Sequence, residues 1–175
     1  MATHAVRVRA ATPTDDAVVD EVSRLATEDL RQVYRRDGSV LSLGPTVRLV
    51  AEVEGEVVGT VRYRRQGNRL HVIGLFVHPE HRRMGVARQM LRSLAGIACE
   101  AGAHCLSLFT VKETGNVRIF ERLGFRAVDE GPARGLVSVR GDGLTDVYME
   151  KPVSAPADQG GQGDATTHNA EDVHP

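Results

Sequence analysis

Hydrophobic residues gather in seven short runs along this chain, and in the first of them, residues 6–10, they alternate with polar residues. Alternation with a period of two buries one face of a run and exposes the other, which is typical of β-strands. Gly, Asn and Pro separate most of these runs, as expected for the turns between strands. The runs that predict strands are residues 6–10, 46–53, 56–64, 69–77, 104–110, 125–129 and 146–151.

Three other segments carry helical signals. Val86, Met90, Leu91, Leu94 and Ala98 repeat with the helical period, so a helix is predicted from Gly85 to about Gly102. Residues 15–36 predict two helices or one broken helix, and residues 116–123 predict a short helix that ends at Gly124. The glycine-rich residues 131–143 are expected to form a mobile loop.

The order of these elements predicts a mixed α/β sheet with helices on both faces. The strand–helix–strand unit at residues 69–110 should be parallel with a right-handed crossover. A chain of 175 residues has room for one domain, which we assign to residues 1–152. Residues 153–175 contain almost no large apolar side chain and are expected to be a disordered tail.

The junction between the strand at 69–77 and the next helix has the features of an anion-binding site. Pro79 ends the strand, and Gly85 opens the helix after Arg82 and Arg83. The first N–H groups of a helix have no internal partner, and the helix dipole favours negative charge there. Gly85 and Ala87 let a phosphate approach the backbone, and an arginine can reach its oxygens. These residues predict a small ligand that carries phosphate.

Composition excludes several other classes. The net charge is -1, tryptophan is absent and aromatic residues make up 4%, so we expect no nucleic-acid partner. No apolar run of about 18 residues occurs, so no membrane association is expected. Cys99 and Cys105, and an N-terminus without an apolar signal core, predict reduced thiols and a cytoplasmic location. His78 and His81 lack a third ligand nearby, so no metal is expected.

Two motifs resemble those of the GNAT superfamily of acetyl-CoA-dependent N-acetyltransferases. The segment Arg82-Arg-Met-Gly-Val-Ala87 resembles the pyrophosphate loop of that family. The segment Asn116-Val-Arg-Ile-Phe-Glu-Arg-Leu-Gly-Phe125 resembles its second block, and residues 147–152 resemble its last strand. The Gly-x-Gly-x-x-Gly and Gly-Lys-Ser/Thr patterns of other nucleotide-binding proteins are absent. The resemblance covers about residues 5–152.

The resemblance implies a seven-stranded, mostly antiparallel sheet in which the fourth strand carries a bulge and splays from the fifth. Acetyl-CoA would lie between these two strands, and the backbone N–H near Phe76 would stabilise the oxyanion. Asn116 could contact the cofactor, cap its own helix, or do both. The residues that the resemblance assigns to the cofactor are Leu75, Phe76, Val77, Arg82, Arg83, Met84, Gly85, Val86, Ala87, Arg88, Asn116 and Phe120.

His71 is the first candidate for the general base. It stands where many members of the family have a glutamate, and alternation would place it on one face with Ile73, Leu75 and Val77. Imidazole titrates near pH 6.5 and can accept a proton from an amine at neutral pH. His71 could equally be a polar residue at the wet end of a strand, and Glu52 is a weaker candidate for the base.

The general acid is the point where this sequence departs from the family. Phe120 stands where a tyrosine hydroxyl usually faces the sulfur of CoA, and phenylalanine cannot donate a proton. Water or another group would have to protonate the thiolate. Tyr148 could replace the missing hydroxyl, although a tyrosine in a strand is more often a packing residue.

The sequence therefore predicts transfer of an acetyl group from acetyl-CoA to a primary amine of a small molecule or peptide, by direct attack. The alternative is a catalytically weak domain that senses CoA, which the absence of a hydroxyl at Phe120 keeps open. Glu28, Asp29 and Tyr34 could attract a cationic acceptor or could be exposed helix residues. An exposed edge strand would permit a homodimer.

Overall fold

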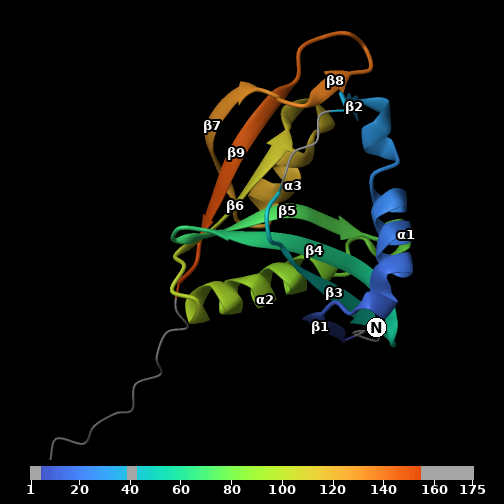
Figure 1. Cartoon of the computed structure of the whole chain (residues 1–175), viewed down its shortest axis with the longest axis vertical. Coiled ribbons are helices and arrows are strands. Elements are labelled where there is room, and N and C mark those ends of the chain that lie inside the picture. Colours follow the sequence, from blue (N-terminus) through green and yellow to red (C-terminus); the bar gives the residue numbers. More distant parts are fainter. Residues whose placement is uncertain (1–4, 39–42, 155–175) are drawn as a thin grey trace, which may run out of the picture.

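The computed structural model describes residues 5–38 and 43–154 and contains a seven-stranded sheet (Figure 1). Only β5 and β6 are parallel, and the other neighbouring strands are antiparallel. The predicted fold class and the parallel unit are both confirmed. Across the sheet the order is β1 (Val6–Ala10), β3 (Val47–Val53), β4 (Glu56–Gln66), β5 (Arg69–Val77), β6 (Cys105–Val111), β9 (Thr145–Pro152) and β7 (Arg126–Pro132).

Helix α2 (Val86–Glu100) covers one face of this sheet. Its predicted apolar face is buried, and Met90 and Leu94 are 0% exposed. The helix ends as predicted: Gly102 adopts a φ of +67°, and the Ala103 N–H donates to the Ala98 carbonyl at 2.7 Å. Helix α3 (Asn116–Arg122) packs against the same core through Val117, Phe120 and Leu123.

Helix α1 (Asp16–Ala26) packs on the opposite face, over β4 and β5. Val19 and Val22 are its buried residues, and they lie outside the core that α2 forms. A short 3-10 turn, η1 (Pro13–Asp15), leads into α1 through a capping box between Thr12 and Asp15. The two faces of the sheet are thus covered by different helices, as the sequence predicts.

The prediction of two helices or one broken helix over residues 15–36 is right for the first part, α1, and wrong for the end of the segment. After α1 the chain forms a single 3-10 turn, η2 (Asp29–Gln32), and then the strand β2 (Tyr34–Arg36). Within the glycine-rich residues 131–143, β7 continues to Pro132 and a further strand, β8 (Leu136–Ser138), follows. β2 and β8 pair antiparallel as a separate small sheet (Figure 1). The stretch expected to be a mobile loop is therefore held by a partner 100 residues away.

The ordered chain continues a short way past residue 152. Val153 packs on the core and its N–H donates to the His104 carbonyl at 2.9 Å. The thiol of Cys99 donates to the Ser154 carbonyl at 3.5 Å. Residues 155–175, the rest of the predicted tail, lie outside the described residues. No helix in the described part of the chain has the length and apolarity to cross a membrane.

Candidate active site

The parallel ladder between β5 and β6 is short. It begins at Arg69 with Cys105 and ends at Val72 with Leu108, although β5 continues to Val77. Beyond Val72 the two strands diverge (Figure 1). The backbone of β5 on this side has no strand partner there, so its N–H and C=O groups are available to a ligand. This is the predicted splay, and it exposes the backbone of Leu75, Phe76 and Val77.

A β-bulge lies at the point where β5 leaves β6. Val72 pairs with Tyr63 and Gly74 pairs with Arg62, so Ile73 is an extra residue without a partner. The prediction that His71, Leu75 and Val77 share one face is therefore wrong. Leu75 and Val77 pack toward the core, whereas His71 lies on the opposite face with the residues Gly74 and Phe76.

The N-terminus of α2 lies beside the end of β5, and Gly85 is the residue just before the helix. Gly85 has a φ of +81° and no side chain caps the helix, so the first amides of α2 have no side-chain partner. Gly59 in β4 permits this placement, because a Cβ there would lie 2.9 Å from Val86 Cγ1. Val86 itself is 1% exposed, so its side chain packs into the core and takes no part in the surface of the site.

The two arginines of the loop differ in their surroundings. Arg82 donates to the Ala26 carbonyl at 3.2 Å and lies 3.8 Å from the Asp29 carboxylate, so it ties the loop to the end of α1. Arg83 is exposed and has a φ of +64°. Met84 is 43% exposed, and Ala87 is half-buried. Arg83 is therefore better placed than Arg82 to meet an anion at the helix terminus.

A basic cavity of about 300 Å³ lies between α2 and the end of α3. Lys151 donates to the Leu123 carbonyl at 2.7 Å, and burial, with Arg88 and Arg92 nearby, lowers the pKa of its ammonium group. No acid forms an ion pair with these cations in the described part of the chain. The lining residues are Arg88, Leu91, Arg92, Arg122, Leu123, Gly124 and Lys151.

His71 is buried on the α1 face of the sheet, with 8% of its surface exposed. Its Nδ1 lies 3.0 Å from the hydroxyl of Ser107, and its ring meets Phe109 edge-on at 5.6 Å. Burial, and then the charge of Arg64, lower the pKa of His71, so the ring is neutral at pH 7. A neutral imidazole that is partly shielded from water can act as a base.

Sequence reasoning named Tyr148 as a possible acid but did not identify Ser107, Glu150 or Arg69 as residues near His71. Ser107 is completely buried in β6, and Tyr148 donates to the Glu150 carboxylate at 3.0 Å in β9. Arg69 binds the same carboxylate at 2.9 Å. The available signal was the polar Ser107 inside the apolar run of β6 and the polar positions that alternate with Val147 and Met149 in β9.

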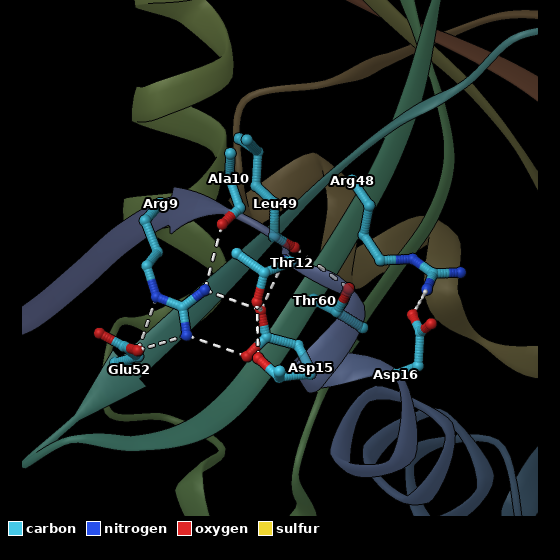
Figure 2. Close-up of polar contacts among 10 residues, drawn as sticks. Arg9, Ala10, Thr12, Asp15, Asp16, Arg48, Leu49, Glu52 and Thr60 are labelled. Atoms are coloured by element: carbon cyan, nitrogen blue, oxygen red, sulfur yellow. Dashed lines mark hydrogen bonds and ion pairs between the residues drawn. The ribbon is translucent and has the colours of Figure 1, made fainter.

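Glu52, the weaker candidate for the base, is already engaged. Arg9 donates to its carboxylate at 2.7 Å and to both oxygens of Asp15 at 2.8 and 2.9 Å. Figure 2 shows Arg9 lying between these two acids. Strand β4 separates Glu52 from β5. The arrangement joins β1, β3 and the start of α1, so its role is structural.

The residues of the second motif lie at and around α3. The ring of Phe120 packs on Phe125 with centroids 5.8 Å apart. Asn116 does not cap the helix, because Gly115 holds that position and the Asn116 N–H donates to Thr114 Oγ1. Phe120 therefore packs against the core.

The segment around Tyr34, which the sequence offers as a place for a cationic acceptor, meets the glycine-rich residues 131–143 at the small sheet. Tyr34 is half-buried in β2 and lies within electrostatic reach of Asp146 in β9. Burial raises the pKa of both side chains. Asp29 instead approaches Arg82, and Glu28 precedes η2. In the described part of the chain, no three His, Cys, Asp or Glu side chains gather as metal ligands.

Comparison with known proteins agrees with this geometry. A model of the acetyltransferase (GNAT) family matches residues 16–125. A nourseothricin acetyltransferase shares the fold with a TM-score of 0.64 and 24% identity, over 86% of this chain and 99% of that one. A PaiA N-acetyltransferase from Thermoplasma acidophilum in complex with coenzyme A has a TM-score of 0.65 and 14% identity, over 85% of this chain and 99% of that one. An aminoglycoside 6'-N-acetyltransferase complexed with coenzyme A has a TM-score of 0.61 and 14% identity, over 87% of this chain and 99% of that one.

Proposed function

Because this chain belongs to the GNAT acetyltransferase family, we propose that it transfers the acetyl group of acetyl-CoA to a primary amine. The observation that carries the proposal is the divergence of β5 from β6 after Val72, next to the uncapped N-terminus of α2. This arrangement offers unpaired backbone to an extended, amide-containing arm and free amides to a pyrophosphate. CoA contains both the amide-containing arm and the pyrophosphate in one molecule.

The residues around the N-terminus of α2 fit a ligand with several phosphates. Gly85 presents no side chain, and Arg83 is exposed beside it. The basic cavity lies farther along the same helix and holds Arg88 and Arg92, four residues apart. An anion there would relieve the repulsion among cations that have no acidic partner. We assign the pyrophosphate to the helix terminus and the remaining phosphate of CoA to the basic cavity.

Acetyl-CoA supplies the activated acetyl group, and the protein supplies positioning, a base and hydrogen-bond donors. Free amines have pKa values of roughly 8 to 10.4, so the attacking amine must lose a proton. His71 accepts that proton, directly or through water, as the amine nitrogen bonds to the carbonyl carbon. The backbone N–H near Phe76 stabilises the oxyanion that develops. The carbon–sulfur bond then breaks, and the electron pair leaves on sulfur.

Water protonates the departing thiolate in this proposal. Phe120 has no proton to donate, and the single hydroxyl hydrogen of Tyr148 is directed to Glu150. Burial also raises the pKa of Tyr148, which makes it a weaker acid. Because thiols have pKa values near 8.5, the thiolate is a tolerable leaving group without an acid. The acceptor is the amine of a small molecule or peptide, bound near Tyr34 and the small sheet.

A thiol-release assay tests the proposal. The protein is mixed with acetyl-CoA and a panel of amino acids, polyamines, aminoglycosides and peptides, and CoA binding is measured in parallel by calorimetry. We expect CoA release that depends on one class of amine. CoA binding without release from any amine would favour a CoA sensor, and no CoA binding at all would overturn the assignment of the site.

A further inference from the structure

Two arginines lie on the face of the sheet that carries His71, one strand away from it. In β4, Arg62 and Arg64 alternate with buried core residues, so both side chains leave the sheet on the α1 face. Strand register places Arg64 beside His71. It also places Arg62 beside Gly74, where β5 has begun to diverge from β6. We call Arg62 and Arg64 the arginine pair.

Helix α1 covers only part of this face and leaves the arginine pair accessible. The helix packs over β4, where Thr60 is 3% exposed. Arg62, two residues farther along the same face, is partly exposed, and so is Arg64. The Arg64 guanidinium donates to the Leu43 carbonyl at 2.7 Å, which fixes its position. The part of the face next to His71 is therefore open and positively charged.

The charge of the arginine pair is not balanced by an acid. Arg48 lies directly opposite Arg62 across β3 and β4, so the register sets two like charges side by side. Figure 2 shows Arg48 turned toward Asp16, 3.4 Å away. In the described part of the chain, no acid forms an ion pair with Arg62 or Arg64. Burial, and then the neighbouring cations, lower the pKa of Arg62, the direction expected for a cation without a counter-charge.

Acids that the sheet places on this face are engaged or distant. The Glu52 carboxylate accepts from Arg9 at 2.7 Å, and the Glu150 carboxylate lies 2.9 Å from Arg69. Asp146 belongs to β9, which lies three strands from β4 in the sheet. A negatively charged group on a ligand would supply the missing counter-charge. Arginine is well suited to such a group, because its guanidinium can bind two oxygens of a carboxylate or phosphate.

The spacing of the strands determines what such a ligand looks like. Neighbouring strands lie about 4.8 Å apart, so an anion at β4 lies only one strand from His71 in β5. We propose that the acceptor is an amine that also carries a carboxylate or phosphate group, which the arginine pair binds while the amine faces His71. This inference rests on the function proposed above and names its substrate class. Polyamines and aminoglycosides bring more positive charge to a cationic surface, so repulsion disfavours them.

Matched amines test the proposed substrate class. The thiol-release assay compares amino acids with their amides, and aminoalkyl phosphonates with the corresponding amino alcohols. A carboxylate raises the pKa of a neighbouring ammonium group, so intrinsic reactivity alone would favour the amide. We expect kcat/KM to be about 10–100-fold higher for the anionic member of at least one pair, and that pair identifies the group. Higher values for amides, polyamines or aminoglycosides would overturn the inference and leave the proposed function intact.

Variants in one strand test the role of the arginine pair. Arg62→Gln should raise KM for the anionic amine by about 10–100-fold and leave KM for acetyl-CoA unchanged. Arg62→Lys keeps the charge and should keep the preference for the anionic amine. Arg65→Gln is the matched control, since Arg65 pairs with the core residue Leu70 on the opposite face and should not affect either KM. A folded Arg62→Gln with the KM of the wild-type protein would overturn the inference.

Calorimetry separates this inference from the proposed function. The full-length protein, saturated with CoA, is titrated with the same amino acids and aminoalkyl phosphonates. Binding that Arg62→Gln abolishes, without CoA release from any amine, would leave the arginine pair as an anion site and contradict the proposed function. Failure of every anionic amine to bind would overturn the inference, whether or not another amine releases CoA.

Discussion

Gly59 in β4 lies directly against Val86, the first residue of α2. A Cβ atom on Gly59 would lie 2.9 Å from Val86 Cγ1 and 3.3 Å from the carbonyl oxygen of Phe76. One glycine therefore brings the helix terminus against the strand whose backbone faces the proposed acetyl-CoA site. The relationship ties packing to function, since any side chain at this position must move the helix or the strand.

Gly59→Ala should weaken CoA binding and destabilise the fold. Val86 has a stiff side chain, so the added methyl displaces the start of α2 at a cost of about 1–3 kcal/mol. Thermal unfolding and calorimetry with CoA measure the two effects. Gly96→Ala is the matched control, because a Cβ at this helical glycine meets nothing within 4 Å. That control should gain about 0.5–1 kcal/mol and keep its affinity for CoA.

Gly85→Glu should reduce CoA affinity through charge as well as backbone strain. The carboxylate would stand at the helix terminus that we assign to the pyrophosphate, and the φ of +81° disfavours any side chain. Gly102→Glu is the control at the other end of α2, since Gly102 has a φ of +67° and equally open surroundings. Both variants should lose about 1 kcal/mol of stability. If both bind CoA equally well, the assignment of the loop is wrong.

Arg92→Glu should weaken binding of CoA more than binding of dephospho-CoA. Arg92 lines the basic cavity, and reversing its charge there opposes the phosphate that only CoA carries. Arg118→Glu makes the same change in charge on an exposed residue of α3 that does not line the cavity. Calorimetry with both ligands at two salt concentrations measures the difference. An equal loss for the two ligands would place the phosphate elsewhere.

The pH dependence of kcat/KM should show an ascending limb below pH 6.5. His71 works as a base only when neutral, and burial together with Arg64 lowers its pKa from about 6.5. Glu150 faces the same region from β9 and forms an ion pair with Arg69. His71→Gln should remove this limb and lower the rate by about 10²-fold or more. An ascending limb that persists in His71→Gln belongs to another group.

Asp15→Asn should destabilise the protein at neutral pH, and the difference from wild type should shrink in acid. Hydrogen bonds from Arg9 and from the Thr12 backbone hold the pKa of Asp15 well below its usual range. A carboxylate with a lowered pKa stabilises the folded state above its unfolded pKa of about 3.9 and loses this effect as pH falls through the folded value. Denaturant titrations between pH 7 and 2.5 measure the change.

Asp16→Asn is the control for that titration. Asp16 is 68% exposed and lies 3.4 Å from Arg48, so its ion pair should contribute little. Figure 2 shows both acids beside the start of α1. A pH-dependent loss of equal size in the two variants would show that the contact between Arg9 and Asp15 is no stronger than a surface ion pair.

The elements nearest the site could be predicted because their signals are local. β5 has the bounds predicted from an apolar run between a turn and Pro79, and α2 begins after Gly85 and ends before Gly102 as its apolar period predicts. The resemblance to GNAT proteins, carried by the segments around Gly85 and Phe120, is confirmed by the family match. These features depend on residues within about one turn or one strand of each other.

Features that depend on pairing between distant strands could not be predicted. The bulge at Ile73 changes which residues share a face with His71, and alternation alone does not reveal an extra residue. Likewise, Tyr34 joins a strand rather than a helix, because its partner Ser138 is supplied by a segment 104 residues later. A three-residue strand is too short to show a period of its own.

The amino-acid sequence by itself determined the family, the order of the strands of the main sheet and the helix terminus proposed to hold the pyrophosphate, since each depends on spacing over a few residues. Only the tertiary structure decided which side chains meet. His71, Ser107 and Glu150 lie on three strands, and the register of β5, β6 and β9 places them side by side. Register is set by the packing of the whole sheet, which no local pattern contains.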